Sequence, residues 1–315
     1  MSTRVKRKVK LKKKNFIIFL IIIFIILFIT TKSIHLIIHS LSNPSSKEIK
    51  EVKEIPKKEK VKEKKLSKEE EKYNKLDNIN KEIDYFNNDY LDRYLNYQAK
   101  NKYLPTEQII KNVNMNLDLT QYKNTIKAKN LNTPKVLVNK YYYLEEDYIP
   151  NNLEKISSMY ALSGMKLVDY AKDAFEEMAK AAAKKNLNIV AMSSYRSYSY
   201  QINLYNRYAK SDGKEKADTY SGRPGHSEHQ TGLAVDIYNQ KENYTNFEKT
   251  KEYDWMLEHA HEYGFILRFP KDKEEETGYH FESWHYRYVG KDIAKYIKEN
   301  NISFEEYYAT KIKDW

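Results

Sequence analysis

The stretch SGRPGHSEHQTGLAVDIYN, residues 221–239, constrains the fold of this chain more than any other feature. Six of the eight histidines in the 315-residue chain lie between positions 226 and 285. Random placement would scatter them, so the clustering has a cause. If that cause is a metal site, the fold has to bring His229, Asp236 and His285 together.

The segment GLAVDIYN, which ends this stretch, has the alternation of a strand that is buried on one face. Leu233 and Val235 fall on the apolar face, and Asp236 falls on the opposite one. His229 precedes Asp236 by seven positions, across a glycine turn. Both polar side chains are therefore placed where a strand begins, next to a turn.

The residue types in the cluster suit a catalytic metal centre. Two imidazoles and one carboxylate are a normal ligand set for catalytic zinc, with a fourth position left for water. A free carboxylate nearby can act as general base on that water, and Glu282 is close to His285 in sequence. The combination of His229, Asp236 and His285 favours a role as metal ligands over a purely structural role. We therefore expect one zinc ion per chain.

Three other histidines have weaker claims. His259 and His261 are two positions apart on a predicted helix and share no face, so we interpret them as ordinary surface or partly buried residues. His280 falls on the same face as Glu282 if the segment alternates as a strand. A regular strand, however, would point Glu282 and His285 to opposite faces, so a turn or bulge has to separate them.

The charge of the chain does not indicate nucleic-acid binding. The formal net charge is +11, but residues 1–14 contain eight Lys or Arg and no acid. The remaining 301 residues carry 47 bases (55 − 8) and 44 acids, a net of +3. Most of the positive charge is thus an N-terminal tag, and we expect no nucleic-acid partner.

An apolar run follows the basic tag. Residues 16–29 are FIIFLIIIFIILFI, and extension to Ile38 gives a segment long enough to span a bilayer. A cleaved secretory signal is the alternative, but only Ser40-Leu41-Ser42 resembles a cleavage site. We therefore expect residues 1–40 to be a cytoplasmic tag with a transmembrane signal-anchor, and the rest of the chain to lie outside the cell membrane, facing the cell wall.

The rest of the chain divides by composition. Residues 41–72 form a Lys/Glu-rich linker, and residues 47–72 alone contain eleven Lys and eight Glu. Residues 73–133 show apolar residues at helical spacing and are expected to be a small, mainly helical region, with one helix starting near Pro105. The chemistry falls in residues 134–315, and the absence of cysteine excludes disulfides and a lipid-modified N-terminal cysteine.

Helices and strands are mixed in residues 134–315 without a regular βαβ rhythm. Helices are expected at 166–186, 198–210 and 253–264, and strand-like segments at 187–197, 232–239 and 279–289. This pattern predicts an α+β fold in which helices flank an antiparallel sheet.

Three motifs resemble one family of enzymes. SEHQTGLAVD fits the S-x-H-x-x-G-x-A-x-D motif, and ESWH fits the E-x-W-H motif, of zinc D-alanyl-D-alanine carboxypeptidases of the VanY type. SSYRSYSYQ resembles the Y-R-S segment of that family. The likeness covers about residues 135–290 and implies the fold of the structural group that includes lysostaphin-like peptidases and the Hedgehog signalling domain.

The resemblance also implies roles for individual residues. It makes His229, Asp236 and His285 the zinc ligands and Glu282 the general base. Arg196 becomes the cation for the substrate carboxylate or the developing oxyanion. Three further residues are expected to line the substrate site: Ser194, Gln201 and Ser227. Two loop residues, Arg223 and His226, receive no role.

The expected activity is zinc-dependent removal of the C-terminal D-Ala from peptidoglycan stem peptides. One alternative is an L,D-carboxypeptidase that trims tetrapeptide stems, and an endopeptidase that cuts cross-bridges is less favoured. Another is a non-catalytic zinc module that binds the cell wall. Glu282 discriminates between an enzyme and a binding module, because a binding module has no need of a base beside its metal.

Overall fold

The computed structural model describes residue 71 and residues 83–314. The predicted signal-anchor and the Lys/Glu-rich linker therefore lie outside the described residues, except for Glu71. No helix among the described residues is both long and apolar enough to cross a bilayer. Residues 83–314 belong to one compact unit.

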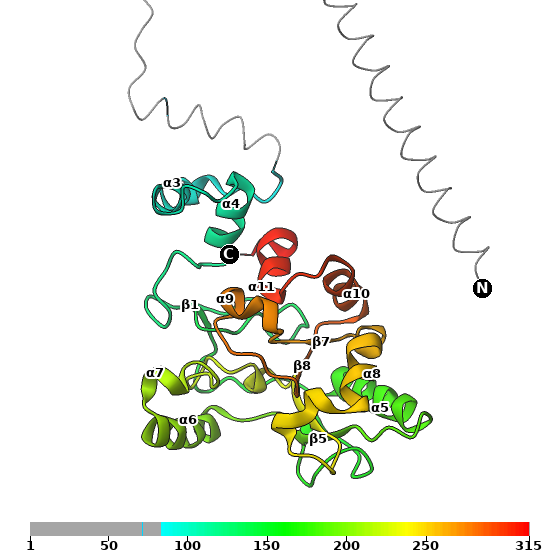
Figure 1. The fold of residues 1–315 in the computed structure, drawn as a ribbon. Coiled ribbons are helices and arrows are strands. Elements are labelled where there is room, and N and C mark those ends of the chain that lie inside the picture. Colours follow the sequence, from blue (N-terminus) through cyan, green and yellow to red (C-terminus); the bar gives the residue numbers. More distant parts are fainter. Residues whose placement is uncertain (1–70, 72–82, 315) are drawn as a thin grey trace, which may run out of the picture. The chain divides into compact units, whose positions relative to one another are not determined.

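A four-stranded antiparallel sheet lies at the centre (Figure 1), as the sequence predicts. Its strands follow the spatial order β5-β6-β8-β7, and each neighbouring pair is antiparallel. The strands are β5 (Val190–Ser193), β6 (Ala234–Tyr238), β7 (Phe265–Leu267) and β8 (His285–Tyr288).

The two faces of this sheet differ in chemistry. Asp236 pairs with His285 across β6 and β8, so these two side chains project from the same face. Val235 pairs with Tyr286 on the opposite face, where both are buried in the main hydrophobic core. Helix α5 (Asp169–Ala183) contributes Phe175 to that core. Apolar packing thus secures one face and leaves the other for polar residues.

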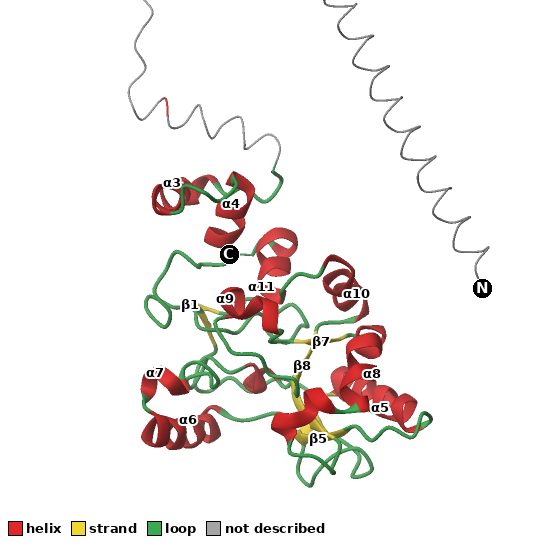
Figure 2. Ribbon diagram, in the orientation of Figure 1, coloured by secondary structure: helices red, strands yellow, loops and turns green. Residues whose placement is uncertain are grey.

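Helices surround the sheet, and two short two-stranded sheets accompany it (Figure 2). The sheet of β1 and β2 is parallel, and that of β3 and β4 is antiparallel. Their bounds are β1 Ile126–Lys127, β2 Tyr142–Tyr143, β3 Leu153–Lys155 and β4 Lys166–Val168. The further helices are α6 Tyr198–Asp212, α7 Lys214–Ala217, α8 Lys251–His259, α9 Glu274–Thr277, α10 Lys291–Asn300 and α11 Phe304–Tyr307.

Among the expected elements whose bounds differ in the structure, two bear on the site. The helix predicted from residue 166 begins at Asp169, because residues 166–168 form β4 and the amide of Val168 donates to the carbonyl of Gly232. The strand predicted over 279–289 is confined to residues 285–288, since a turn precedes it at Ser283 and Trp284.

The predicted helical region contains two helices, α3 (Leu91–Lys100) and α4 (Thr106–Asn114). Pro105 is the N-cap of α4, as expected from the sequence. Tyr94 of α3 and Ile110 of α4 belong to a separate small apolar cluster. An ion pair of 3.0 Å between Nζ of Lys111 and Oε1 of Glu306 ties α4 to the last helices of the chain.

Candidate active site

Three short elements bring the predicted ligands together. His229 lies on a 3₁₀ turn, η2 (Glu228–Thr231), Asp236 on β6 and His285 at the start of β8. Nε2 of His229 is 3.3 Å from Oδ2 of Asp236, and Nδ1 of His285 is 3.2 Å from Oδ1 of the same carboxylate. One ligand atom from each of the three residues lies within 4.8 Å of the other two, and all three residues are buried.

Gly232 makes the turn between η2 and β6. Its φ is +69°, in the left-handed region, which residues with a Cβ seldom adopt. A Cβ at this position would lie 2.9 Å from Leu153 and 3.0 Å from Val168. The glycine of the motif therefore allows the chain to reverse between His229 and Asp236 against a packed wall.

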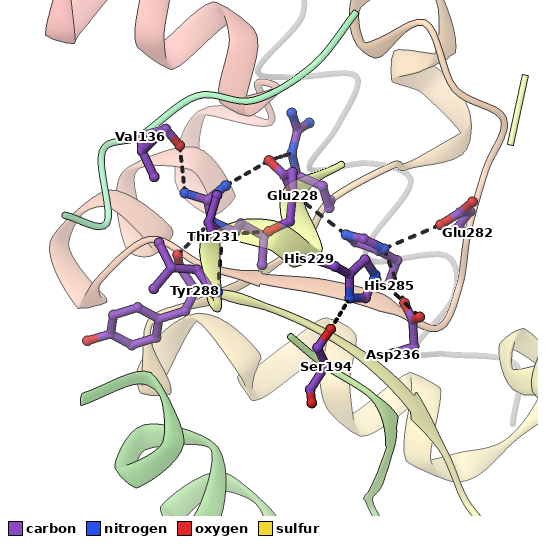
Figure 3. Close-up of polar contacts among 12 residues, drawn as sticks. Val136, Ser194, Glu228, His229, Thr231, Asp236, Glu282, His285 and Tyr288 are labelled. Carbon is purple, nitrogen blue, oxygen red and sulfur yellow. Dashed lines mark hydrogen bonds and ion pairs between the residues drawn. The ribbon is translucent and has the colours of Figure 1, made fainter. Parts of the chain in front are cut away.

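A hydrogen bond through Nδ1 fixes the orientation of the His229 ring. Its Nδ1 lies 2.6 Å from the carbonyl oxygen of Ser194 (Figure 3). A carbonyl only accepts, so Nδ1 carries the proton and Nε2 presents its lone pair toward Asp236. A histidine held in this way through its second nitrogen is typical of metal ligands.

The residues present fit a metal ion. Nε2 of His229 and Oδ1 of Asp236 are buried, and neither makes a hydrogen bond to any other described residue. Buried polar atoms without partners are rare and costly in folded proteins. A cation held between the three ligands would satisfy both atoms.

Charge and burial set the protonation of the ligands. Burial and the charge of Arg196 lower the pKa of His229 to about 4. Burial alone would raise the pKa of Asp236, but His229, His285 and Arg196 outweigh it and hold that pKa well below its usual range. A neutral imidazole and an ionised carboxylate are the states that bind metal.

His285 binds its proton more tightly than His229 does. Burial alone would lower its pKa, but the carboxylates of Asp236 and Glu228 raise it to about 9. A metal ion at the three ligands therefore competes with a proton on His285.

Glu282 lies beside the ligands, on the turn before β8. Its Oε2 is 3.5 Å from Nδ1 of His285, and its side chain is buried. Burial, together with the negative charge of Asp236, raises its pKa to about 8. Positive charge at the ligands would lower that pKa again, because a nearby cation favours the carboxylate.

A cleft of about 460 Å³ opens onto this site. All three ligands and Glu282 line it, together with Arg196, Gln201 and Ser227. Aromatic side chains form much of the remaining wall: Tyr200, Tyr208, Tyr220, Tyr244, Phe269 and Trp284. The predicted base, cation and two of the three predicted substrate contacts thus share one cleft.

Arg196 and Gln201 each have an atom without a partner. Nη2 of Arg196 lies 3.4 Å from Oδ2 of Asp236, whereas its buried Nε makes no hydrogen bond to described residues. Nε2 of Gln201 donates to the carbonyl of Gly222 at 2.7 Å, and its Oε1 is likewise left without a described partner. Both residues line the cleft.

The structure corrects the expectation for Ser194. Its hydroxyl is buried, accepts a hydrogen bond from the amide of Lys166 at 2.8 Å and does not line the cleft. A β-bulge between Ala191 and Ser193 shifts the register at this end of β5. Ser194 acts on the site through its carbonyl, which holds His229, and not as a substrate contact.

Three of the remaining histidines fall into two groups. His259 lies 3.0 Å from Glu262, and exposed His280 lies 3.5 Å from Glu274, so both pair with surface carboxylates. His226, which had no predicted role, lines the cleft, and its Nδ1 lies 2.7 Å from the carbonyl of Asn139.

Sequence reasoning missed a buried ion cluster behind His285. Glu228 pairs with Arg268 and Arg287, each at 2.8 Å, and Arg268 also binds Glu305 of α11. All four side chains are almost fully buried. The only signal in the sequence is that Glu228 lies next to His229 inside the SEHQTG segment.

Three comparisons with known proteins find relatives of one enzyme class. The family model described as VanY, D-alanyl-D-alanine carboxypeptidase, matches residues 164–291. The putative carboxypeptidase YodJ of Bacillus subtilis (strain 168) is 37% identical over 209 residues, which cover 60% of this chain and 74% of the relative.

Two solved structures share the fold. The LdcB LD-carboxypeptidase is 35% identical, with a TM-score of 0.55, over 61% of this chain and 93% of that one. VanYB in complex with D-alanine-D-alanine is 31% identical, with a TM-score of 0.50. The match covers 56% of this chain and 98% of VanYB. The mixed fold and the buried polar site define a peptide hydrolase of the carboxypeptidase class. The chain belongs to the VanY family of D-alanyl-D-alanine carboxypeptidases.

Proposed function

We propose that this protein is a zinc-dependent carboxypeptidase that removes the C-terminal D-Ala from peptidoglycan stem peptides. The observation that carries the proposal is the position of Glu282, a buried carboxylate 3.5 Å from a ligand nitrogen and open to the cleft. A module that only bound zinc and cell wall would have no use for this carboxylate. Zinc is the metal that two imidazoles and one carboxylate favour in hydrolytic sites.

His229, Asp236 and His285 would hold the zinc ion. A bound zinc ion supplies a Lewis acid, which lowers the pKa of water to about 7 and polarises a carbonyl. Glu282 accepts a proton from the attacking water while the oxygen of that water bonds to the scissile carbonyl carbon. The C–N bond then breaks, and Glu282 returns the proton to the leaving amine of D-Ala.

Arg196 suits a substrate that ends in a carboxylate. Its guanidinium lines the cleft beside the ligands, and its Nε makes no hydrogen bond to described residues. A peptide cut at its last bond carries a carboxylate next to the scissile carbonyl, within reach of such a cation. Binding of D-alanine-D-alanine by VanYB supports this class of substrate.

An L,D-carboxypeptidase is the second candidate, because LdcB, a protein named as an LD-carboxypeptidase, has the same fold at 35% identity. The two activities differ in the residue before the scissile bond, which is D-Ala in a pentapeptide stem and an L-centre in a tetrapeptide stem. Aromatic side chains line the cleft, and the shape of this wall would decide which of the two residues is accepted there.

We propose the outer face of the cell membrane as the place of action. Support comes from the eight basic residues that precede the apolar run at 16–29. Stem peptides of the cell wall are found on that side.

Purified muropeptides test the activity directly. The full-length protein, purified in detergent and loaded with zinc, is incubated with pentapeptide and tetrapeptide muropeptides, and the products are read by mass spectrometry. Loss of one alanine from the pentapeptide alone supports the D,D-activity, and loss from the tetrapeptide supports the L,D-activity. Zinc and peptide binding without release of alanine would instead indicate a binding module.

A further inference from the structure

Glu228 lies on the side of His285 that faces away from Asp236. Its Oε1 accepts hydrogen bonds from Nε of Arg268 and Nη1 of Arg287, each at 2.8 Å. Its Oε2 is buried, makes no hydrogen bond to described residues and lies 3.6 Å from Nε2 of His285. That nitrogen is also buried without a partner, so two unsatisfied polar atoms face each other (Figure 3).

We propose that Glu228 is a positioning residue for the metal site. It accepts a hydrogen bond from the Nε2 proton of His285 and so fixes both the tautomer and the direction of the ring. A neutral imidazole has one proton, and a proton kept on Nε2 leaves the lone pair on Nδ1. Nδ1 is the nitrogen that lies 3.2 Å from Asp236 and 3.5 Å from Glu282. The inference rests on the proposed metal site and adds to it.

The two arginines determine which way Glu228 presents its oxygens. Arg268 and Arg287 are almost fully buried, and a guanidinium only donates hydrogen bonds. They therefore hold Oε1 and leave Oε2 for His285. Oε2 of Glu228 is thus an acceptor held at a fixed place beside His285.

The two ligand histidines are consequently held in opposite ways. His229 donates from Nδ1 to the carbonyl of Ser194 and presents Nε2 to Asp236. In the proposed arrangement, His285 donates from Nε2 to Glu228, which lies 3.6 Å away in the structure, and presents Nδ1 to the carboxylate of Asp236. Hydrogen-bond partners of this kind orient ligating histidines, and their loss typically costs about 10–100-fold in metal affinity.

Glu228→Gln tests the inference with little change in size. The two arginines need an acceptor, so the amide oxygen of Gln stays with them and its NH₂ group faces His285. A donor at that place favours a proton on Nδ1, which removes the lone pair from the ligand side. We expect the zinc dissociation constant of the full-length protein, measured in detergent against a chromogenic chelator, to rise about 10–100-fold.

Glu305→Gln is the matched control. Glu305 accepts from Arg268 at 2.8 Å and is as deeply buried as Glu228. Its substitution removes the same charge from the same cluster but leaves the oxygen that faces His285 in place. We expect the zinc dissociation constant of this variant to stay within about threefold of wild type, and circular dichroism to show that both variants are folded. Equal losses in both variants, or no loss in Glu228→Gln, would overturn the proposal.

A spectrum of the wild-type protein decides the question even if neither variant folds. In the zinc-loaded, ¹⁵N-histidine-labelled protein, the signals of two histidines should shift on metal binding. We expect one of them to carry its proton on Nδ1 and the other on Nε2. If both carried it on Nδ1, Glu228 would not be the partner of His285. Failure of the wild type to bind zinc would instead contradict the proposed function.

Discussion

Glu282 and His285 face the same site although they are three residues apart at the edge of a strand. The amide of His285 donates to the carbonyl of Glu282 at 3.3 Å, which closes a turn through Ser283 and Trp284. A continuous strand would have pointed the two side chains to opposite faces of the sheet. The turn is what places a base beside a ligand.

Glu282→Gln separates catalysis from metal binding. Glutamine keeps the size and hydrogen-bonding capacity of the side chain but cannot accept a proton. We expect full zinc content, an unchanged fold and release of D-Ala from a pentapeptide at least about a hundredfold more slowly, since general base catalysis typically contributes 10²–10⁴-fold. A rate near that of wild type, with zinc bound, would mean that another group is the base. His280 would not be that group, because it pairs with Glu274 at the surface and does not line the cleft.

Zinc content distinguishes the ligands from the other histidines. We expect about one zinc per chain in wild type, and its loss in alanine variants of His229, Asp236 and His285, because an open site with three protein ligands tolerates the loss of one poorly. His259→Ala and His261→Ala are controls outside the cleft and should keep their zinc. Metal analysis of dialysed protein measures this, and unchanged zinc in His285→Ala would contradict the ligand set.

Gly232→Ala tests the turn that joins η2 to β6. The substitution combines left-handed backbone strain with overlap against Leu153 and Val168, and we expect it to lower the free energy of unfolding by about 2–5 kcal/mol. Gly164→Ala is the control, since Gly164 also has a positive φ but has nothing within 4 Å of its would-be Cβ. Urea denaturation should show a loss of only about 1–2 kcal/mol there. Equal losses would mean that packing against Gly232 contributes nothing.

Lys140 makes the stability depend on pH. Burial lowers its pKa to about 8, whereas the unfolded chain has a lysine pKa of about 10.4. Between pH 8 and 10 the unfolded state therefore binds more protons, and stability rises with pH. The gain should be on the order of 1–2 kcal/mol after allowance for partial access of water to the ammonium group.

Lys140→Met removes this titration, and the difference between wild type and variant isolates it. Urea denaturation at pH 8 and at pH 9.5 should show wild type gaining stability relative to the variant. Both pH values lie below the pKa of Tyr122, which burial raises above the ordinary tyrosine value of about 10, so this neighbour does not interfere. Parallel pH dependences in the two proteins would show that Lys140 does not titrate in this range.

The proposed location predicts the result of proteolysis. Protease added to intact protoplasts should remove residues 134–315, because eight bases before the apolar run favour an N-terminus in the cytoplasm. A cytoplasmic marker protein in the same sample should survive. Protection of the domain until the membrane is broken would show that the orientation is the reverse.

The polar pattern of the sequence predicted much of the site, because local rules place these residues. Alternation in GLAVDIYN put Asp236 opposite the apolar face, and it is there. The requirement for a turn between Glu282 and His285 was likewise confirmed. Such inferences need only the two-residue period of a strand and the residues of a turn.

Other features of the site depend on contacts between residues that are distant in sequence, and local sequence patterns do not predict such contacts. Glu228, Arg268, Arg287 and Glu305 are distant in sequence, and each alone would be expected at the surface. Burial of a charged side chain is costly unless it is paired, and only the assembled fold brings these opposite charges together. The position of Ser194 was missed for a related reason, since a bulge in β5 changes which group faces the cleft.

Glu305 lies on α11, the last α-helix among the described residues, yet it belongs to the row of charges that ends at His285. During synthesis, the ligands and Glu282 emerge from the ribosome before the segment that completes their support. A chain stopped ahead of α11 would contain all three sequence motifs but lack the carboxylate that pairs with Arg268 in the buried ion cluster. The order of translation thus leaves the ion cluster behind His285 incomplete until α11 has been made.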